Sequence, residues 1–332
     1  MGRLFCILGV LFGGVFITPA QGIFEGPTQF IPVEVDRMYV KGINFLRDHQ
    51  KDNGTFSSPG RTDTYGQQPG VVGLAVVAML AHGDDPNRGP YALAIRKGLD
   101  FIIKSQNKST GYIGSSMYNH GFASLALAEA YGQVHDQRLG AALKKATDLI
   151  LNAQKRSSKG GWRYSPESSD ADTTVTGAQF VALMAARNAG LGVPQESLDK
   201  ALRFYISCQS GDGGIGYTSA GSSNGPRTAI AGLCFALAKK KESQRFKSAM
   251  DYLVQQGSSG GYDHYYHYFL YYAAQTYFHA SPKLWAQWNA DNIAPAVDST
   301  GRWPLGREFW WQLCHGRIAF ITGLKLSLSS DL

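Results

Sequence analysis

The chain has 332 residues, of which 44% are apolar and 17% are charged, and its formal net charge is +7. This apolar content excludes an intrinsically disordered chain, because disordered chains lack the apolar side chains that build a core. The 39 glycines show no Gly-X-Y period, which excludes collagen. The basic residues are scattered, and their densest run, Lys239 to Lys241, is too short to predict a nucleic-acid-binding surface.

Residues 1–20 have the pattern of a secretory signal peptide. Arg3 precedes an apolar run from Leu4 to Ile17, and a cleavage site is predicted near Ala20. The run has about 14 residues, whereas a membrane-spanning helix needs about 20. We therefore expect a secreted or periplasmic protein without an integral membrane span after cleavage. The alternative is an uncleaved anchor.

A motif of about fifty residues recurs along the rest of the chain. In each copy an amphipathic helix leads to a Gln, and a turn with a Gly and an aromatic residue follows. The Gln residues of the first five copies are Gln50, Gln106, Gln154, Gln209 and Gln256. A looser sixth copy lies between Trp285 and Trp303.

A second helix, apolar on nearly all sides, follows the turn in each copy. A helix without a polar face is buried all round. These helices are expected at residues 71–81, 121–131, 175–189, 228–238, 265–278 and 318–328. Six half-polar outer helices and six buried inner helices predict an all-α fold, an α/α toroid (α6/α6 barrel) of six helical-hairpin repeats in a closed double ring.

The repeats also predict the domain organisation and a structural role for the Gln. We expect a signal peptide (1–20), an N-terminal extension (21–34) and one repeat domain (35–332). The repeat Gln is expected to bond the free backbone N–H groups that start a neighbouring helix. In this interpretation the Gln and the aromatic residue hold the ring together and do not catalyse.

The motif resembles the QW repeat of the prenyltransferase and squalene-oxidase repeat superfamily. Its first copy, Lys41 to Phe56, matches the family pattern with Phe in place of Trp, and the resemblance covers about residues 35–328. Members include terpene cyclases and protein prenyltransferase β subunits, which are α/α toroids with an apolar central cavity. The resemblance implies a secreted terpene-cyclase-like or prenyltransferase-like protein that binds an isoprenoid or another lipid. We assign no cofactor to this chain.

Two acidic residues before the third inner helix are the candidate catalytic groups. Class II terpene cyclases carry Asp-x-Asp-Asp-Thr at a similar place, where the middle Asp protonates an alkene. By this resemblance Asp172 matches the middle acid and Asp170 the first, while Thr173 stands where the family has its last Asp. The alternative is that Asp172 caps the helix, and a helix N-terminus favours the ionised form.

Aromatic residues are the candidates for lining an apolar substrate site, because aromatic faces stabilise cations. These residues are Trp162, Tyr262, Tyr265, Tyr268, Trp310 and Trp311. The alternative is that they only pack the core of the ring.

A candidate metal site lies at Asp263, His264 and His267, whose side chains are donor types that zinc accepts. Protein prenyltransferases hold zinc with Asp, Cys and His near the corresponding inner helices, but Tyr265 stands here where the family has Cys. We therefore assign no metal, and ordinary polar contacts are the alternative use of these residues.

Two other functions stay open at this point. One is a non-catalytic α/α toroid that binds a protein or envelope material. The other is a glycan-active α/α barrel, which needs paired carboxylates facing one cleft. Acidic residues at or near the turns before the inner helices supply candidates for such a pair: Asp63, Asp170, Asp172, Asp212, Asp263 and Glu308.

Overall fold

The computed structural model describes residues 33–57, 65–257 and 266–293, which form eleven α-helices, one 3-10 turn (η2, Tyr65–Gln67) and no β-strand. The outer helices are α1 (Val33–His49), α3 (Ala92–Ser105), α5 (Arg138–Gln154), α7 (Gln195–Ser207), α9 (Gln244–Gln256) and α11 (Pro282–Ile293). The inner helices are α2 (Pro69–Ala81), α4 (Met117–Ala130), α6 (Thr173–Asn188), α8 (Gly225–Leu237) and α10 (Tyr266–Ala280).

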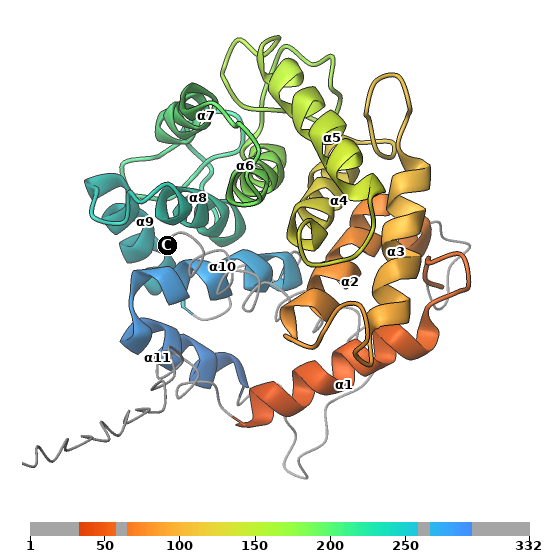
Figure 1. Ribbon diagram of the computed structural model, residues 1–332. Helices are drawn as coiled ribbons and strands as arrows, with labels where there is room; N and C mark the ends of the chain where they lie inside the picture. Colours follow the sequence, from red (N-terminus) through yellow and green to blue (C-terminus); the bar gives the residue numbers. More distant parts are fainter. Residues whose placement is uncertain (1–32, 58–64, 258–265, 294–332) are drawn as a thin grey trace, which may run out of the picture.

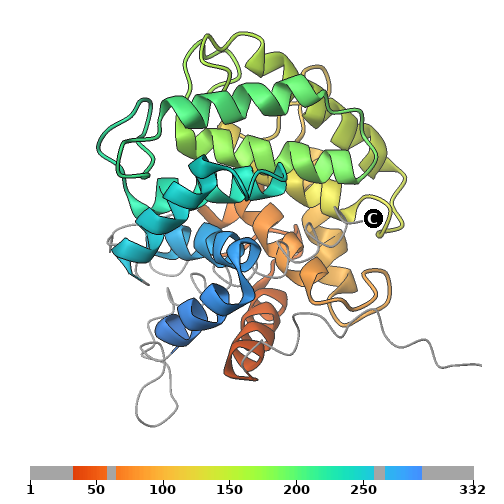
Figure 2. The same ribbon diagram turned by 90° about the vertical axis from the view of Figure 1, so that its left-hand side faces the viewer.

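The inner helices follow one another around a ring, since α2 contacts α4, α4 contacts α6, α6 contacts α8 and α8 contacts α10. The outer helices pack around them, and α11 lies beside α1 in both views (Figures 1 and 2). The protein is therefore an all-α α/α toroid, as the repeats predict. The sixth inner helix predicted at residues 318–328 lies outside the described residues.

The division into outer and inner helices follows from which side chains can leave water. Twelve of the thirteen residues of α2 are buried, whereas α7, of the same length, buries five. Burying apolar surface stabilises the fold by about 25 cal/mol per Å². Among the helices that the structure describes, none is both long and apolar enough to span a membrane.

Glycines let the inner helices approach one another closely. A glycine on each of four inner helices faces the next one around the ring: Gly73, Gly121, Gly177 and Gly232. A Cβ on Gly177 of α6 would lie 2.1 Å from Cγ2 of Ile230 on α8. The small residues of the inner helices are thus required by the spacing of the ring.

The repeat Gln ties each outer helix to the next, but not in the predicted way. The Nε2 groups of Gln50, Gln106, Gln154 and Gln209 each donate two hydrogen bonds of 2.6–3.2 Å. One goes to a carbonyl of the following turn and the other to a carbonyl near the start of the next outer helix. The prediction that the Gln bonds helix N–H groups is therefore wrong, because carbonyls with a second lone pair are its acceptors.

The turn glycine of the motif is required by a close backbone approach. Gly54 has φ +85°, and a Cβ there would lie 2.2 Å from the carbonyl oxygen of Lys97 on α3. Gly111, Gly160 and Gly213 have similar positive φ angles and approach α5, α7 and α9 in the same manner.

A polar residue of three inner helices fastens the turn that precedes it. Nδ1 of His120, Oγ1 of Thr176 and Oγ1 of Thr228 accept the backbone N–H of Ile113, Trp162 and Ile215, respectively. The three polar residues are each 0% exposed. The same structural position therefore holds a His in one repeat and a Thr in two others.

Candidate functional site

Among the described residues, three inner helices begin with a side-chain cap, and one of the three caps is a carboxyl group. Oγ of Ser116 accepts the N–H of Asn119 at the start of α4, and Oδ1 of Asn224 accepts the N–H of Arg227 at the start of α8. Asp172 occupies the equivalent place at α6, which confirms the capping interpretation. Neutral side chains cap the neighbouring repeats, so capping alone does not require an acid at Asp172.

The two carboxyl oxygens of Asp172 have different surroundings. Oδ1 accepts three hydrogen bonds, from the N–H of Thr174 (2.9 Å), the hydroxyl of Thr174 (2.6 Å) and the N–H of Val175 (2.8 Å). Oδ2 is buried and forms no hydrogen bond in the described part of the chain. The residue as a whole is 0% exposed. This arrangement suits a carboxyl group that keeps its proton on Oδ2.

Burial raises the pKa of Asp172 above its ordinary value. The hydrogen bonds from Thr174 and Val175 and the charge of Arg163 act in the opposite direction, because they favour the carboxylate. Desolvation is the larger effect, so the preference of the helix N-terminus for the ionised form does not set the direction of the shift. The site thus favours the protonated acid more than water does.

Asp170 lies in the opposite environment. Its side chain is 44% exposed and pairs with Arg163 at 2.5 Å and with Lys159 at 3.0 Å. Hydrogen bonding to Lys159 is the main reason why the pKa of Asp170 is lowered. The two candidate acids therefore differ in charge preference. The raised pKa of Asp172 arises mainly from burial, not from the charge of Asp170.

A group of tyrosines adjoins Asp172. The hydroxyl of Tyr118 on α4 donates to Oγ1 of Thr174, which in turn donates to Oδ1 of Asp172. Burial raises the pKa values of Tyr118, Tyr268 and Tyr272, so these side chains stay neutral phenols. The rings of Tyr268 and Tyr272 on α10 meet edge to face with centroids 5.1 Å apart.

Aromatic side chains also join helices that are not neighbours in the ring. The ring of Phe122 on α4 contacts that of Tyr271 on α10 edge to face, with centroids 6.1 Å apart. Since α6 and α8 lie between these two helices in the ring order, the contact crosses the interior of the toroid. Aromatic side chains therefore occupy part of the interior of the toroid.

A second aromatic group lies nearer the surface, before α6 and α8. The hydroxyls of Tyr164 and Tyr217 are 2.5 Å apart, and Tyr164 is 47% exposed. The guanidinium of Arg163 lies 5.8 Å and 5.6 Å from the centroids of these two rings, and that of Arg227 lies 5.9 Å from Tyr217. Sequence reasoning missed this group, although both tyrosines occur in repeat turns.

The structure describes only some of the other predicted site residues. Trp162 is 2% exposed, and its indole N–H donates to the carbonyl of Ile150 at 2.8 Å. Tyr268 lies on α10, where it interacts with Tyr118 and Tyr272. Four predicted residues, Tyr262, Tyr265, Trp310 and Trp311, lie outside the described residues.

The candidate metal site also lies outside the described part of the structure, which does not include Asp263, His264 or the side chain of His267. Among the residues that the structure does describe, no group of three or more His, Cys, Asp or Glu side chains is placed to hold a metal ion.

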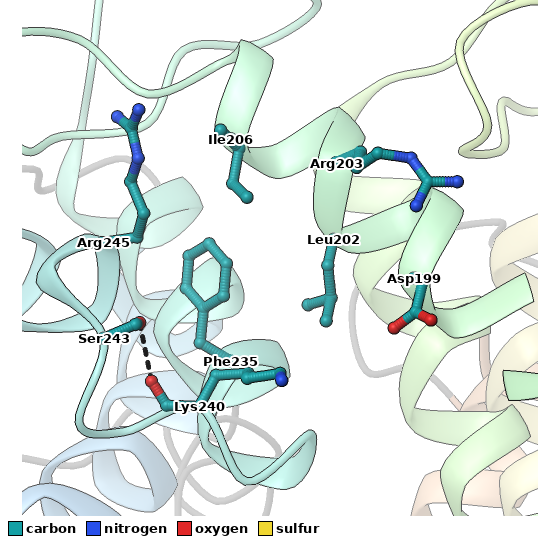
Figure 3. Close-up of a pocket in the computed structure, with 8 residues that line it drawn as sticks. All are labelled: Asp199, Leu202, Arg203, Ile206, Phe235, Lys240, Ser243 and Arg245. Atoms are coloured by element: carbon teal, nitrogen blue, oxygen red, sulfur yellow. Dashed lines mark hydrogen bonds between the residues drawn. The ribbon is translucent and has the colours of Figure 1, made fainter. Parts of the chain in front are cut away.

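Two pockets of about 240 Å³ each flank the outer helix α7. The pocket between α7 and α9 has an apolar floor of Leu202, Ile206 and Phe235 with charged residues around it (Figure 3). The other pocket lies between α7 and the turn after α5, and it is lined mostly by polar and cationic side chains.

The sequence profile of one family, described as Domain of unknown function (DUF6288), matches residues 36–292. The chain belongs to this family. A comparison with curated proteins found no match.

Solved structures with the same fold include enzymes of different chemistry. The GH76A α-1,6-mannanase from Salegentibacter sp. HEL1_6 has a TM-score of 0.60 at 10% identity, and the match covers 88% of this chain and 99% of that one. A D-mannose isomerase has a TM-score of 0.63 at 14% identity, covering 90% and 99%. The type II terpene cyclase MstE from Scytonema has a TM-score of 0.59 at 13% identity, covering 89% and 100%. At these identities the likeness establishes the fold alone.

Proposed function

We propose that this protein binds an isoprenoid or a similarly apolar molecule at the N-terminal ends of its inner helices, and that Asp172 protonates it. The observation that carries this proposal is the buried Oδ2 of Asp172, which has no hydrogen-bond partner in the described part of the chain. The neighbouring repeats make the same cap with Ser116 and Asn224, so the acid serves a purpose other than capping.

The chemistry that suits this group is proton transfer to a carbon–carbon double bond. The π electrons of the alkene form a new C–H bond with the proton of Oδ2, and the second alkene carbon becomes a cation. The electrons of the broken O–H bond stay on Asp172, where the three donors to Oδ1 stabilise the carboxylate. Transfer of a proton from the carbon skeleton back to the Asp172 carboxylate ends the reaction and regenerates the acid.

The tyrosine faces near Asp172 support the same proposal. Aromatic rings attract cations through their negative faces, most strongly where water is excluded. Tyr118, Tyr268 and Tyr272 are held neutral by burial, so their rings offer this face without introducing a charge. The terpene cyclase with the same fold supports it as well, since one of its structures contains geranylgeranyl dihydroxybenzoate as substrate.

Two measurements test the proposal. Mass spectrometry of the lipids that co-purify with the protein should find an isoprenoid. Incubation with linear polyprenes in D₂O should give a product with deuterium at the protonated carbon. Asp172→Asn should keep the cap through its side-chain oxygen and lose this incorporation. Asp170→Asn, two residues away in an exposed position, is the matched control and should retain it.

The outcomes separate the possible functions. Incorporation that is unchanged in Asp172→Asn would remove Asp172 from the reaction. A bound isoprenoid without turnover would identify a lipid carrier and contradict the proposed role of Asp172 in catalysis. A protein that neither binds nor converts polyprenes would contradict the proposal as a whole.

Action on a glycan is the second candidate, and a specific observation favours it. Asp172 and Asp170 have environments that shift their pKa values in opposite directions, as the acid and the base of a glycoside hydrolase require. The exposed ring of Tyr164 beside them offers a face on which a sugar can stack. The test is sugar release from a panel of polysaccharides, including α-1,6-mannan. Loss of release in both Asp172→Asn and Asp170→Asn would support this function over proton transfer to an alkene.

We also propose that the protein is exported and that cleavage occurs near Ala20. This proposal rests on the sequence of residues 1–20, which lie outside the described residues. Mass spectrometry of the protein from its native host should give a chain that begins near Gln21. An intact N-terminus would identify an uncleaved anchor. The boundary between the 21–34 extension and the 35–332 domain stays a prediction.

A further inference from the structure

The turn after α5 differs in length from the equivalent turns of the other repeats. The repeat Gln bonds a turn glycine four or five residues later in three repeats, but Gln154 bonds Gly160, six residues later. The longer turn carries Ser157, Ser158 and Lys159. Each of these three residues lines the polar pocket beside α7.

The outer helix that faces this turn has a reversed charge at one position. The turn glycine of each repeat packs against an equivalent residue of the next outer helix, which is Lys200 in α7. Three residues further on, α3, α5 and α9 carry Asp100, Asp148 and Asp251, whereas α7 carries Arg203. Where three other repeats place a carboxylate, the fourth repeat therefore places a cation.

The insertion and the charge reversal meet in one pocket of about 240 Å³. Its lining includes four cations and two hydroxyls: Lys155, Lys159, Lys200, Arg203, Ser157 and Ser158. Two carboxylates lie close by, since Asp170 pairs with Lys159 at 3.0 Å and Glu196 pairs with Lys200 at 2.9 Å. The pocket therefore keeps an excess of positive charge after these pairs are counted.

Further observations concern the polar groups at the pocket. The hydroxyl oxygen of Ser157 is buried and has no hydrogen-bond partner in the described part of the chain. The guanidinium of Arg203 points away from Phe235 and Arg245, out of the apolar pocket that it also lines (Figure 3). The donors of the Arg203 guanidinium therefore lie on the side away from the apolar pocket. The hydroxyl of Ser158 already donates to the carbonyl of Ser169 at 3.1 Å.

We propose that this pocket binds a tetrahedral oxyanion, phosphate or sulfate, either free or as an ester. Ammonium, guanidinium and hydroxyl groups are the donors that such anions take, and charge-assisted bonds are about twice as strong as neutral ones. One water molecule needs about 10–15 Å³ of such volume, so the pocket of about 240 Å³ has room for the anion and part of an attached group. The site is separate from Asp172 and does not depend on the function proposed above.

Isothermal titration calorimetry of the full chain tests this site, with sodium chloride used to hold the ionic strength constant. Inorganic phosphate, sulfate and phenyl phosphate are the probes. We expect saturable binding to the wild type and at least tenfold weaker binding to Arg203→Asp, which installs the residue of the other three repeats. Lys159→Ala should also weaken binding. Lys108→Glu, in the equivalent turn after α3, changes the net charge by the same amount and should bind as the wild type does.

The three probes distinguish the source of the anion. Equal binding of phosphate and sulfate assigns the site to tetrahedral oxyanions in general, and tighter binding of phenyl phosphate assigns it to an ester. Absence of saturable binding to the wild type would overturn the proposal. Equal losses in Arg203→Asp and Lys108→Glu would also overturn it, because the effect would then be one of net charge. Thermal melts of each variant without ligand check that all of them are folded.

Discussion

Unfolding in mild acid is expected to depend on His120. The ring is 0% exposed, its Nδ1 accepts the N–H of Ile113 at 3.1 Å, and its Nε2 donates to the carbonyl of Ala146 at 3.0 Å. These two bonds need a neutral ring with its hydrogen on Nε2. Burial lowers the pKa of His120 from 6.5 to about 4.

The sign and the size of the effect follow from these pKa values. Above about pH 6.5 the ring is neutral in the folded and unfolded chains, and stability does not depend on its titration. As the pH falls below that value, the unfolded chain binds a proton that the folded chain excludes, so stability is lost. Between neutral pH and about pH 4 the loss amounts to about 3 kcal/mol, since one pKa unit corresponds to about 1.4 kcal/mol.

The variant His120→Thr isolates this contribution. Thr stands at the equivalent position in two other repeats, as Thr176 and Thr228, where its hydroxyl accepts the turn N–H. Denaturant unfolding at a series of pH values gives the free energy of unfolding of each protein. Between about pH 7 and about pH 4, the wild type should lose about 3 kcal/mol more than the variant. Parallel curves for the two proteins would refute the reasoning, whatever their offset at neutral pH.

Two further predictions concern the ring. Gln209→Ala removes both donated hydrogen bonds and should lower the free energy of unfolding by about 1–3 kcal/mol. Its control, Gln244→Ala on an exposed surface, should change the free energy of unfolding by less than about 0.5 kcal/mol. Equal melting temperatures for the two variants would contradict the role of Gln209 in joining two outer helices. Gly177→Ala places a methyl group 2.1 Å from a side-chain carbon of the adjacent inner helix and should cost about 1–3 kcal/mol. Gly192→Ala, where an added Cβ has nothing within 4 Å, is its control. A Gly177→Ala protein as stable as this control would show that the inner helices can move apart at little cost.

The periodicity of the sequence was sufficient to predict the architecture. Helices that are apolar all round must be buried, and the five described inner helices lie where this pattern places them. Four of them begin a few residues earlier than predicted. Polar caps and first-turn prolines, such as Asp172 and Pro226, belong to the helix start without being part of the apolar run.

The interactions between repeats were harder to predict, because they depend on which backbone groups meet. The repeat Gln indicates a hydrogen-bonded link between repeats, but a side-chain amide can both donate and accept. Only the packed structure shows that its N–H groups donate to backbone carbonyls. The group of Tyr118, Thr174 and Asp172 joins two repeats whose residues lie 54–56 positions apart. No local pattern relates such residues before the helices are packed.

The balance of effects on Asp172 illustrates the same limit. A sequence shows that Asp172 precedes a helix, and the helix N-terminus favours the carboxylate. It does not show that the residue is completely buried, which is the larger effect. The reversed charge at Arg203, in contrast, is visible in the aligned repeats, although its significance depends on the pocket that it lines.

The titration of the Asp172 carboxyl group is the most direct test of the proposed proton donor. Carbon-13 NMR of protein labelled at the aspartate side-chain carboxyl carbons follows this group, and its signal is assigned by its absence in Asp172→Asn. We predict a midpoint clearly above the ordinary value of 3.8, while Asp170 titrates below it. A midpoint for Asp172 at or below 3.8 would identify an ionised cap and contradict the account.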